Sequence, residues 1–116
     1  MRTRDTNPIL RVVPTDHETD VPRDTTVLVT ASRPVDHQSA VGVRVRSEGG
    51  DVDGVLDISS DGRILFWRPM QTLAAQARHQ VTISGMCDER GTPFGEHAST
   101  FVTGVFSYDD LQILTE

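Results

Sequence analysis

The sequence predicts an all-β fold: an antiparallel β-sandwich of about seven strands, with one short helical turn between the fifth and sixth strands. Apolar and polar residues alternate along most of the chain, which is the pattern of half-buried strands. Turn residues interrupt this alternation about every 8–12 residues, a spacing typical of two packed antiparallel sheets. Only residues 71–78 have a helical composition, and this segment would bridge two strands.

The alternation is clearest at residues 41–46, where valines occupy one face and a glycine and two arginines occupy the other. β-Branched side chains dominate residues 25–31, as is typical of strands. Residues 48–51 and 60–63 contain the glycines that tight hairpin turns favour, because glycine adopts a positive φ without a steric penalty. The predicted strands span residues 9–13, 25–31, 41–46, 52–58, 63–68, 79–85 and 99–105.

Length and charge limit the class of protein. The 116 residues fit one domain, with residues 1–8 as a flexible N-terminal segment, residues 9–104 as the sandwich and residues 105–116 as a tail that forms an added strand or a linker. A net charge of −6 argues against binding to nucleic acid. The longest apolar run, residues 64–67, is too short to insert into a membrane. Residues 1–8 lack the apolar core of a secretory signal, so the chain is cytoplasmic if Met1 is the native start, or else a module of a longer exported protein.

The residue types that carry most enzymatic chemistry are scarce. The chain has no lysine, which excludes Schiff-base catalysis. Its single cysteine, Cys87, excludes an internal disulfide and a cysteine-based zinc site. No pair of histidines has metal-ligand spacing, and we expect structural or solvated roles for His17, His37, His79 and His97. We therefore expect a non-enzymatic protein that needs no cofactor.

One segment has the beginning of a calcium-binding loop. Residues 57–64 place oxygen-bearing side chains at positions one, three and five of such a loop and a glycine at position six. The bidentate carboxylate that closes the loop is missing, because Arg68 occupies position twelve. A solvated hairpin tip explains the same residues, so a calcium- or carbohydrate-dependent ligand-binding module is the alternative to a structural role. The candidate calcium ligands are Asp51, Asp53, Asp57, Ser59 and Asp61.

Three apolar residues form a candidate interaction patch on an outer sheet face. If Leu65 and Trp67 face the core, then Ile64 and Phe66 face outward. Val55 also points away from the core on the neighbouring strand. Soluble monomers usually cover or use a patch of this kind. The C-terminal tail, a neighbouring domain, a protein partner or a weakly associated second copy would cover it.

Several short segments occur in an order that is characteristic of one family. They are Val13-Pro14, Asp20-Val21-Pro22, residues 27–36, residues 61–69, Leu73, residues 81–85, Asp88, Gly91 and Phe101-Val102-Thr103. Together they resemble the bacterial immunoglobulin-like (Ig-like) domain of the S-layer (SbsA-like) type, over residues 9–104. The resemblance implies an Ig-like sandwich that serves as a non-catalytic module of extracytoplasmic, cell-surface proteins. His79 stands where that family usually has tyrosine, and we expect it to take the corner role of that residue.

Overall fold

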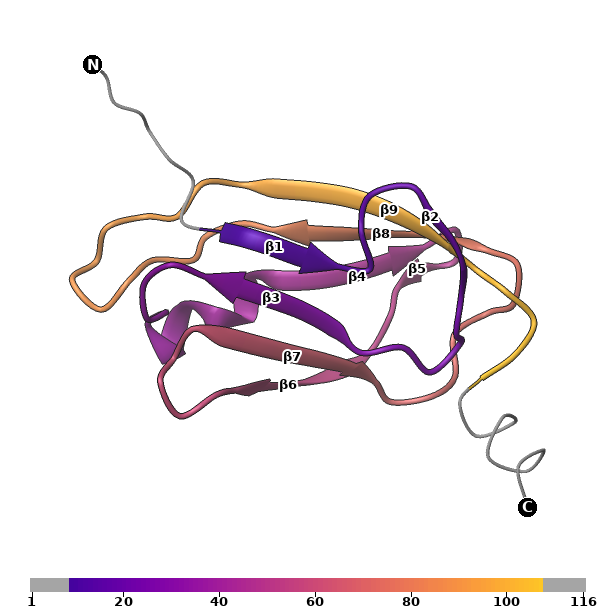
Figure 1. Ribbon diagram of the computed structural model, residues 1–116, viewed down its shortest axis with the longest axis horizontal. Helices are drawn as coiled ribbons and strands as arrows, with labels where there is room; N and C mark the ends of the chain where they lie inside the picture. Colours follow the sequence, from indigo (N-terminus) through magenta and orange to yellow (C-terminus); the bar gives the residue numbers. More distant parts are fainter. Residues whose placement is uncertain (1–8, 108–116) are drawn as a thin grey trace.

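Nine strands form two sheets that lie face to face in the structure, a computed structural model that describes residues 9–107 (Figure 1). The strands are β1 (Ile9–Val13), β2 (Glu18–Val21), β3 (Val27–Ala31), β4 (Val43–Ser47), β5 (Gly50–Asp51), β6 (Gly54–Ile58), β7 (Ile64–Pro69), β8 (Arg78–Ile83) and β9 (His97–Thr103). The four-stranded sheet has the order β1-β3-β7-β6, and the five-stranded sheet has the order β2-β9-β8-β4-β5. Neighbouring strands are antiparallel except β2 and β9, which are parallel.

The predicted all-β sandwich is confirmed, but the described residues contain nine strands rather than about seven. The two additional strands are β2 and β5. β5 is only two residues long, and β2 exposes three of its four residues. Neither strand has the alternating burial that would make it visible in the sequence.

The helix of the described residues is a 3-10 helix, η1 (His37–Gly42), and it lies between β3 and β4. The helical turn that the sequence predicts at residues 71–78 is instead an irregular connection. The backbone of this connection forms a hydrogen bond with the segment that follows β2, in which the Leu73 amide donates to the Arg23 carbonyl at 2.8 Å. Gln76 adopts a left-handed φ of 51°, which a right-handed helix cannot accommodate.

The core lies between the sheets, because alternation along each strand turns one row of side chains inward. On β7, Leu65 and Trp67 are buried in the core, whereas Ile64 and Phe66 are half-buried on the outer face. This is the register that the sequence predicts. Burying one large apolar side chain stabilises the fold by about 1.5–3 kcal/mol relative to leaving it exposed. The fully buried side chains of largest volume are Phe101, Leu65, Ile83 and Met86.

The connections gather at the two ends of the sandwich, as Figure 1 shows. One end carries η1, the turn between β6 and β7 and the long connection from β8 to β9, and the other carries the connection from β7 to β8. No helix within the described residues has the length and apolarity that a membrane crossing requires. Residues 1–8 and 108–116 lie outside the described residues, so the predicted N-terminal segment and most of the predicted tail stay predictions.

Candidate functional site

The side-chain oxygens predicted to bind calcium at the β6–β7 hairpin form hydrogen bonds with other groups of the protein. Asp57 on β6 accepts a hydrogen bond from the guanidinium Nη2 of Arg68 on β7, at 2.6 Å. Ser59 donates to Oδ1 of Asp61 at 2.6 Å, and the Arg63 amide donates to the same carboxylate oxygen at 3.0 Å. These hydrogen bonds hold the pKa of Asp61 below its usual value, the bond from Ser59 being the largest cause. The oxygens therefore close a turn rather than frame an ion site.

The remaining calcium candidates lie elsewhere. Asp51 on β5 pairs with Arg46 on β4 at 3.3 Å, so it belongs to the other sheet. Asp53 is exposed in the connection between β5 and β6. Within the part of the chain that the structure describes, no three His, Cys, Asp or Glu side chains come together as metal ligands do. The structure thus does not assemble the predicted set, and the same holds for the four histidines.

A pocket of about 340 Å³ opens between the β4–β5 hairpin and the β7–β8 connection. We call it the His79 pocket, after the one histidine in its wall. Two of the calcium candidates, Asp51 and Asp53, line it from one side. Its volume falls within the usual range for small-molecule sites. The lining residues are Ser47, Asp51, Val52, Asp53, Met70, Gln71, Thr72, Leu73, Ala74 and His79.

His79 is nearly inaccessible to solvent, with 1% of its surface exposed. Its ring stacks on Phe101 of the adjacent strand β9, with centroids 5.2 Å apart and planes inclined by 10°. Nδ1 lies 3.0 Å from the carbonyl oxygen of Ala77, two residues earlier in the chain, and the expected corner role stays a prediction. The other ring nitrogen, Nε2, is buried without a hydrogen-bond partner among the described residues. Burial lowers the pKa of His79 and outweighs the opposing hydrogen bond to Ala77.

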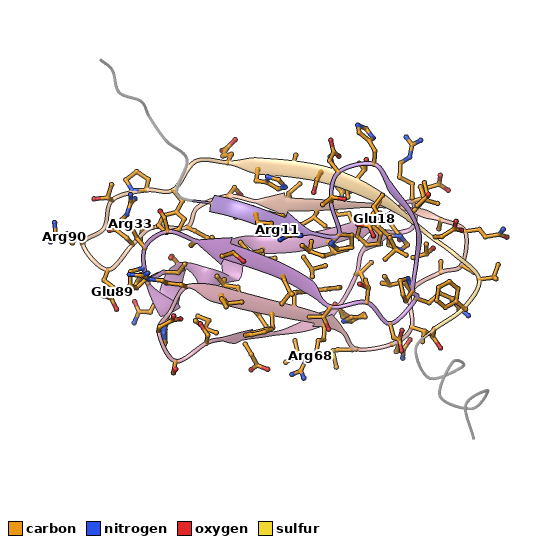
Figure 2. The ribbon with its side chains drawn as sticks, viewed as in Figure 1. Arg11, Glu18, Arg33, Arg68, Glu89 and Arg90 are labelled. Carbon is orange, nitrogen blue, oxygen red and sulfur yellow. The ribbon has the colours of Figure 1, made fainter. Side chains whose placement is uncertain are left out.

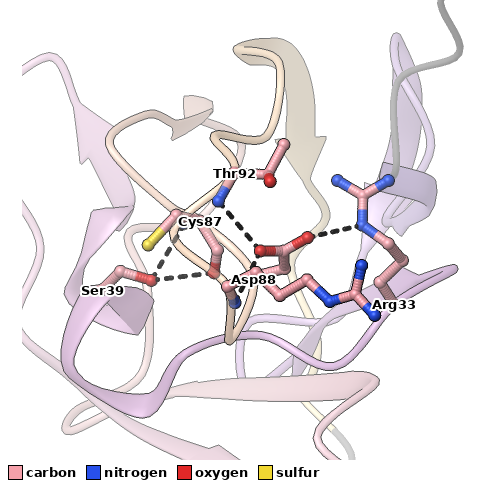
Figure 3. Close-up of polar contacts among 6 residues, drawn as sticks. Arg33, Ser39, Cys87, Asp88 and Thr92 are labelled. Atoms are coloured by element: carbon pink, nitrogen blue, oxygen red, sulfur yellow. Dashed lines mark hydrogen bonds and ion pairs between the residues drawn. The ribbon is translucent and has the colours of Figure 1, made fainter.

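At the opposite end, Asp88 organises the start of the β8–β9 connection. Its carboxylate is nearly buried and accepts hydrogen bonds from the amides of Arg90 and Thr92, each at 2.9 Å, and from Nε of Arg33 at 2.9 Å (Figure 3). Burial alone would raise the pKa of Asp88, but the amide hydrogen bonds and the Arg33 guanidinium lower it further than burial raises it. The Arg33 guanidinium also lies 5.4 Å from the centre of the Phe94 ring. The amide bonds close the loop on itself, and the contacts of Arg33 tie it to the segment that follows β3, so these contacts are structural.

Cys87, next to this cluster, is held through its backbone. Its amide donates to Oγ of Ser39 at 3.1 Å, and the Ser39 hydroxyl lies 3.3 Å from the Cys87 carbonyl oxygen (Figure 3). A second backbone bond runs from the Asp36 amide to the same carbonyl, at 2.9 Å. The thiol is half-buried and takes part in none of these bonds. The residue anchors η1 to the β8–β9 connection.

The predicted interaction patch lies on the outer face of the four-stranded sheet. Val55 on β6 is 46% exposed, and Ile64 and Phe66 on β7 are half-buried. The β3 residue opposite Phe66 is Leu28, and the β1 residue opposite Leu28 is Val13, both half-buried as well. Sequence reasoning missed these two, although the alternation at residues 9–13 and 25–31 places them on that face.

Charged groups frame this apolar face. Figure 2 shows Arg11 on β1 toward one side of the sheet and Arg68 near the opposite side. Arg68 is paired with Asp57. In the register of β6 and β7, Asp57 lies opposite Phe66 and Arg68 lies opposite Val55, so the ion pair borders these two apolar residues. We call Val13, Leu28, Val55, Ile64 and Phe66 the outer apolar face. An apolar centre with a polar rim is the usual anatomy of a protein–protein contact.

Comparison with known proteins identifies the fold. A family model described as a bacterial Ig-like domain matches residues 5–103. No curated protein matches the chain. Three similar solved structures are an S-layer protein and two L,D-transpeptidases.

The S-layer protein rSbsC aligns with a TM-score of 0.58 and 20% identity, over 78% of this chain and 13% of that chain. L,D-transpeptidase 3 from Mycobacterium tuberculosis, in complex with a faropenem-derived adduct, aligns with a TM-score of 0.59 and 23% identity, over 83% and 37%. The transpeptidase LdtMt1, in complex with imipenem, aligns with a TM-score of 0.63 and 18% identity, over 86% and 41%. At these identities the likeness shows the fold alone, and in each case the chain spans less than half of the matched protein.

Proposed function

The chain belongs to the bacterial Ig-like domain family, and we propose that it is a non-catalytic structural and interaction module of a multidomain bacterial surface protein, of the S-layer (SbsA-like) type. The proposal includes an extracytoplasmic location. The proposal that the chain is a module of a multidomain protein is supported by the length of proteins of similar fold. They are much longer than this chain, which matches 13% to 41% of their length. A fold that forms a minor part of longer chains suits a spacer or docking domain, since the activity of the whole protein can reside in another domain.

The observation that carries the interaction part of the proposal is the outer apolar face. Val13, Leu28 and Phe66 form a row across β1, β3 and β7, with Ile64 beside Phe66 on β7. On the edge strand β6 the residue opposite Phe66 is Asp57, and Val55 lies opposite Arg68. The outer face of the five-stranded sheet differs, because it presents Arg44, Arg46, Gln80 and Thr82. Leaving a large apolar side chain in water forgoes about 1.5–3 kcal/mol relative to full burial. The occupant we propose is an adjoining domain of the same polypeptide, because the matched proteins carry this fold within a longer chain.

The calcium- or carbohydrate-dependent alternative has weaker support. Arg68 and Arg46 neutralise two of the candidate carboxylates, and the turn uses the oxygens of Ser59 and Asp61. A calcium site needs six to eight oxygen ligands that are free to converge, and the hairpin offers three such side chains, Asp57, Ser59 and Asp61. We therefore keep the structural and interaction module as the proposed function.

Sedimentation velocity of the chain over a concentration series tests the proposal. Without an adjoining domain, the outer apolar face should cause weak self-association with a Kd of about 0.1–1 mM. Val55→Glu should abolish it, because a charge would replace the most exposed apolar side chain of the face. Val102→Glu is the matched control: Val102 is half-buried on β9, between the inward-facing Phe101 and Thr103, and so lies on the outer face of the other sheet.

Three results would overturn the proposal. A chain that stays monomeric at every concentration has no adhesive face. A dimer with a Kd below about 1 μM means that the occupant is a second copy of the chain rather than an adjoining domain. Equal effects of Val55→Glu and Val102→Glu would place the contact elsewhere.

A further inference from the structure

A pocket of about 380 Å³ opens at the end of the sandwich that carries η1. Its walls are the segment that follows β3, the turn between β6 and β7, and the start of the β8–β9 connection. Figure 2 shows Arg33, Glu89 and Arg90 together at this end. We call it the arginine pocket, because Arg33, Arg63 and Arg90 line it, together with the acidic residues Asp88 and Glu89. Its volume falls within the usual range for small-molecule sites.

Main-chain contacts hold the three walls of the arginine pocket together. The amides of Ala31 and Val35 donate to the carbonyl oxygens of Arg63 and Gly62, each at 2.8 Å, and so tie the first wall to the turn. Val35 also forms an antiparallel bridge with Asp88, which ties the first wall to the third. A site that is held in place before it binds loses less conformational freedom on binding. These contacts use the backbone, so they do not depend on the arginine side chains.

Two of the three guanidinium groups are free to bind another molecule. The Asp88 carboxylate is satisfied by two loop amides and by Nε of Arg33, so these two side chains neutralise each other (Figure 3). Arg63 and Arg90 are exposed, and neither guanidinium forms an ion pair with any side chain that the structure describes. Arginines therefore outnumber carboxylates in this pocket, although the net charge of the chain is −6. A hollow lined by unpaired guanidinium groups favours an anion.

The placement of the two free guanidinium groups favours a tetrahedral anion. Arg63 and Arg90 belong to different walls, and each guanidinium presents a planar fork of N–H donors. A carboxylate has two oxygens, and one fork satisfies both. A phosphate monoester has three acceptor oxygens and a charge of about −1.5 to −2 at pH 7, so it can accept from two forks at once. The net charge of −6 disfavours a long polyanion, whose further charges would be repelled.

We propose that the arginine pocket binds a phosphate group, either free phosphate or a small phosphate monoester, between the guanidinium groups of Arg63 and Arg90. Arg33 and Asp88 hold the third wall in place, and Glu89 opposes binding through its negative charge. This inference is independent of the proposed function, because it uses the end of the sandwich and no residue of the outer apolar face.

Titration of the 15N-labelled chain at about pH 8 and constant ionic strength, followed by amide and arginine Nε–H resonances, tests the proposal. The probes are inorganic phosphate and methyl phosphate. Two matched anions separate their features: dimethyl phosphate is tetrahedral with a single charge, and acetate is planar with a single charge. We expect saturable shifts at residues 32–34, 62–63 and 88–90 with inorganic phosphate, at a Kd of about 1–10 mM. Both matched anions should bind at least about threefold more weakly.

Four variants identify the groups in the pocket. Arg63→Gln and Arg90→Gln should each weaken phosphate binding about threefold to fivefold, and because both side chains are exposed the fold should stay intact. Glu89→Gln should strengthen binding about twofold, because it removes a repelling charge. Arg44→Gln is the matched control: Arg44 is exposed on β4 and lines a different pocket, so this variant loses the same charge elsewhere. Its Kd should stay within about 1.5-fold of the parent value.

The comparison of the two probes identifies the source of the phosphate group. If methyl phosphate binds at least as tightly as inorganic phosphate, a monoester is the ligand, and if it binds more weakly, the free ion is. The proposal fails if neither probe produces saturable shifts up to about 50 mM. It also fails if Arg44→Gln weakens binding as much as Arg63→Gln and Arg90→Gln do, because only the overall charge would then matter. Equal affinity for acetate and phosphate would likewise overturn it, since the pocket would then not recognise a tetrahedral anion.

Discussion

Gly54 on β6 lies against the indole ring of Trp67 on β7, so closely that a Cβ atom at position 54 would overlap atoms of the ring. The atoms nearest to a Cβ at this position are Cε2, Cζ2 and Nε1 of the indole. Trp67 is 4% exposed and is the single tryptophan of the chain. The glycine therefore makes room for the largest side chain of the core at the edge of the four-stranded sheet.

Gly54→Ala should destabilise the protein by about 1–3 kcal/mol, because the methyl group forces Trp67 or the edge strand to move. Chemical denaturation measures the loss, and the emission maximum of Trp67 reports the displaced indole directly. Gly49→Ala is the control, since the nearest heavy atom to a Cβ there is Oγ of Ser47 at 3.9 Å. The control should stay within about 0.5 kcal/mol of the parent. Equal stability of the two variants would contradict the packing described here.

The sequence predicts those strands whose side chains alternate between buried and exposed, and it does not predict the strands that are held through their backbones. Period-2 alternation predicts β3, β4, β7 and β8, because buried residues alternate with more exposed ones along most of each strand. β2 and β5 pair through their backbones while exposing most of their side chains, so their residues carry no such pattern. Residues 71–78 have a helical composition, but Leu73 is drawn into the core and Gln76 is left-handed. Tertiary contacts override local propensity there.

The candidate site is less predictable than the fold. Alternation places His79 on the same face as Val81 and Ile83, so its burial can be inferred from sequence. The pocket beside it depends on two connections that are distant in sequence, and no local pattern brings them together. The carboxylates of Asp51 and Asp57 also look unpaired in the sequence, because the arginine that pairs with each comes from a neighbouring strand.

The stability of the protein should fall with decreasing pH below about 6.5, and His79 should contribute to this fall. Burial lowers the His79 pKa from 6.5, so the unfolded chain takes up a proton before the folded chain does. Unfolding then binds protons, and the contribution of His79 is complete above pH 6.5 and declines as the pH approaches the lower folded-state value. Urea denaturation at pH 7 and at pH 5 measures the change.

His79→Phe should have a smaller loss of stability between these pH values than the parent, because phenylalanine cannot take up the proton. The variant keeps the ring stack on Phe101, and replacing a buried polar group that lacks a partner by an apolar group can be neutral or stabilising. Parallel pH dependences of parent and variant would show that His79 is not the group responsible.

Calcium at millimolar concentration should leave the melting temperature unchanged. Asp57 is occupied by Arg68, and Ser59 and Asp61 bond to each other within the turn. A ligand present at about 100 times its Kd would stabilise the protein by about 2.7 kcal/mol, which differential scanning calorimetry detects easily. A rise of several degrees that Asp61→Ala abolishes would restore the calcium-dependent alternative. Magnesium serves as the control cation, because it demands a stricter octahedral geometry.

A reducing agent should likewise leave the melting temperature of the monomer unchanged, to within about one degree. Cys87 is the single cysteine, so no disulfide can form within the chain. Its backbone holds η1 to the β8–β9 connection, and reduction does not alter those hydrogen bonds. Cys87→Ser should therefore match the parent under oxidising and reducing conditions alike. A large drop on reduction in a sample shown to be monomeric would contradict this role.

Removing residues 108–116 should change neither the stability of the sandwich nor the weak association of the outer apolar face by more than about twofold. The described chain ends away from that face: the Phe106 carbonyl accepts a hydrogen bond from the Arg23 amide at 2.9 Å, and Ser107 is buried. Residues 105–107 thus continue beside the segment that follows β2, and the deletion leaves these contacts intact. Denaturation and sedimentation velocity of the shortened chain measure both quantities. If the deletion instead converts a monomer into a concentration-dependent dimer, and Val55→Glu reverses this, then the tail covers Val55, Ile64 and Phe66. The proposal that an adjoining domain occupies the face would then be wrong, because the tail of the chain would already cover these apolar side chains.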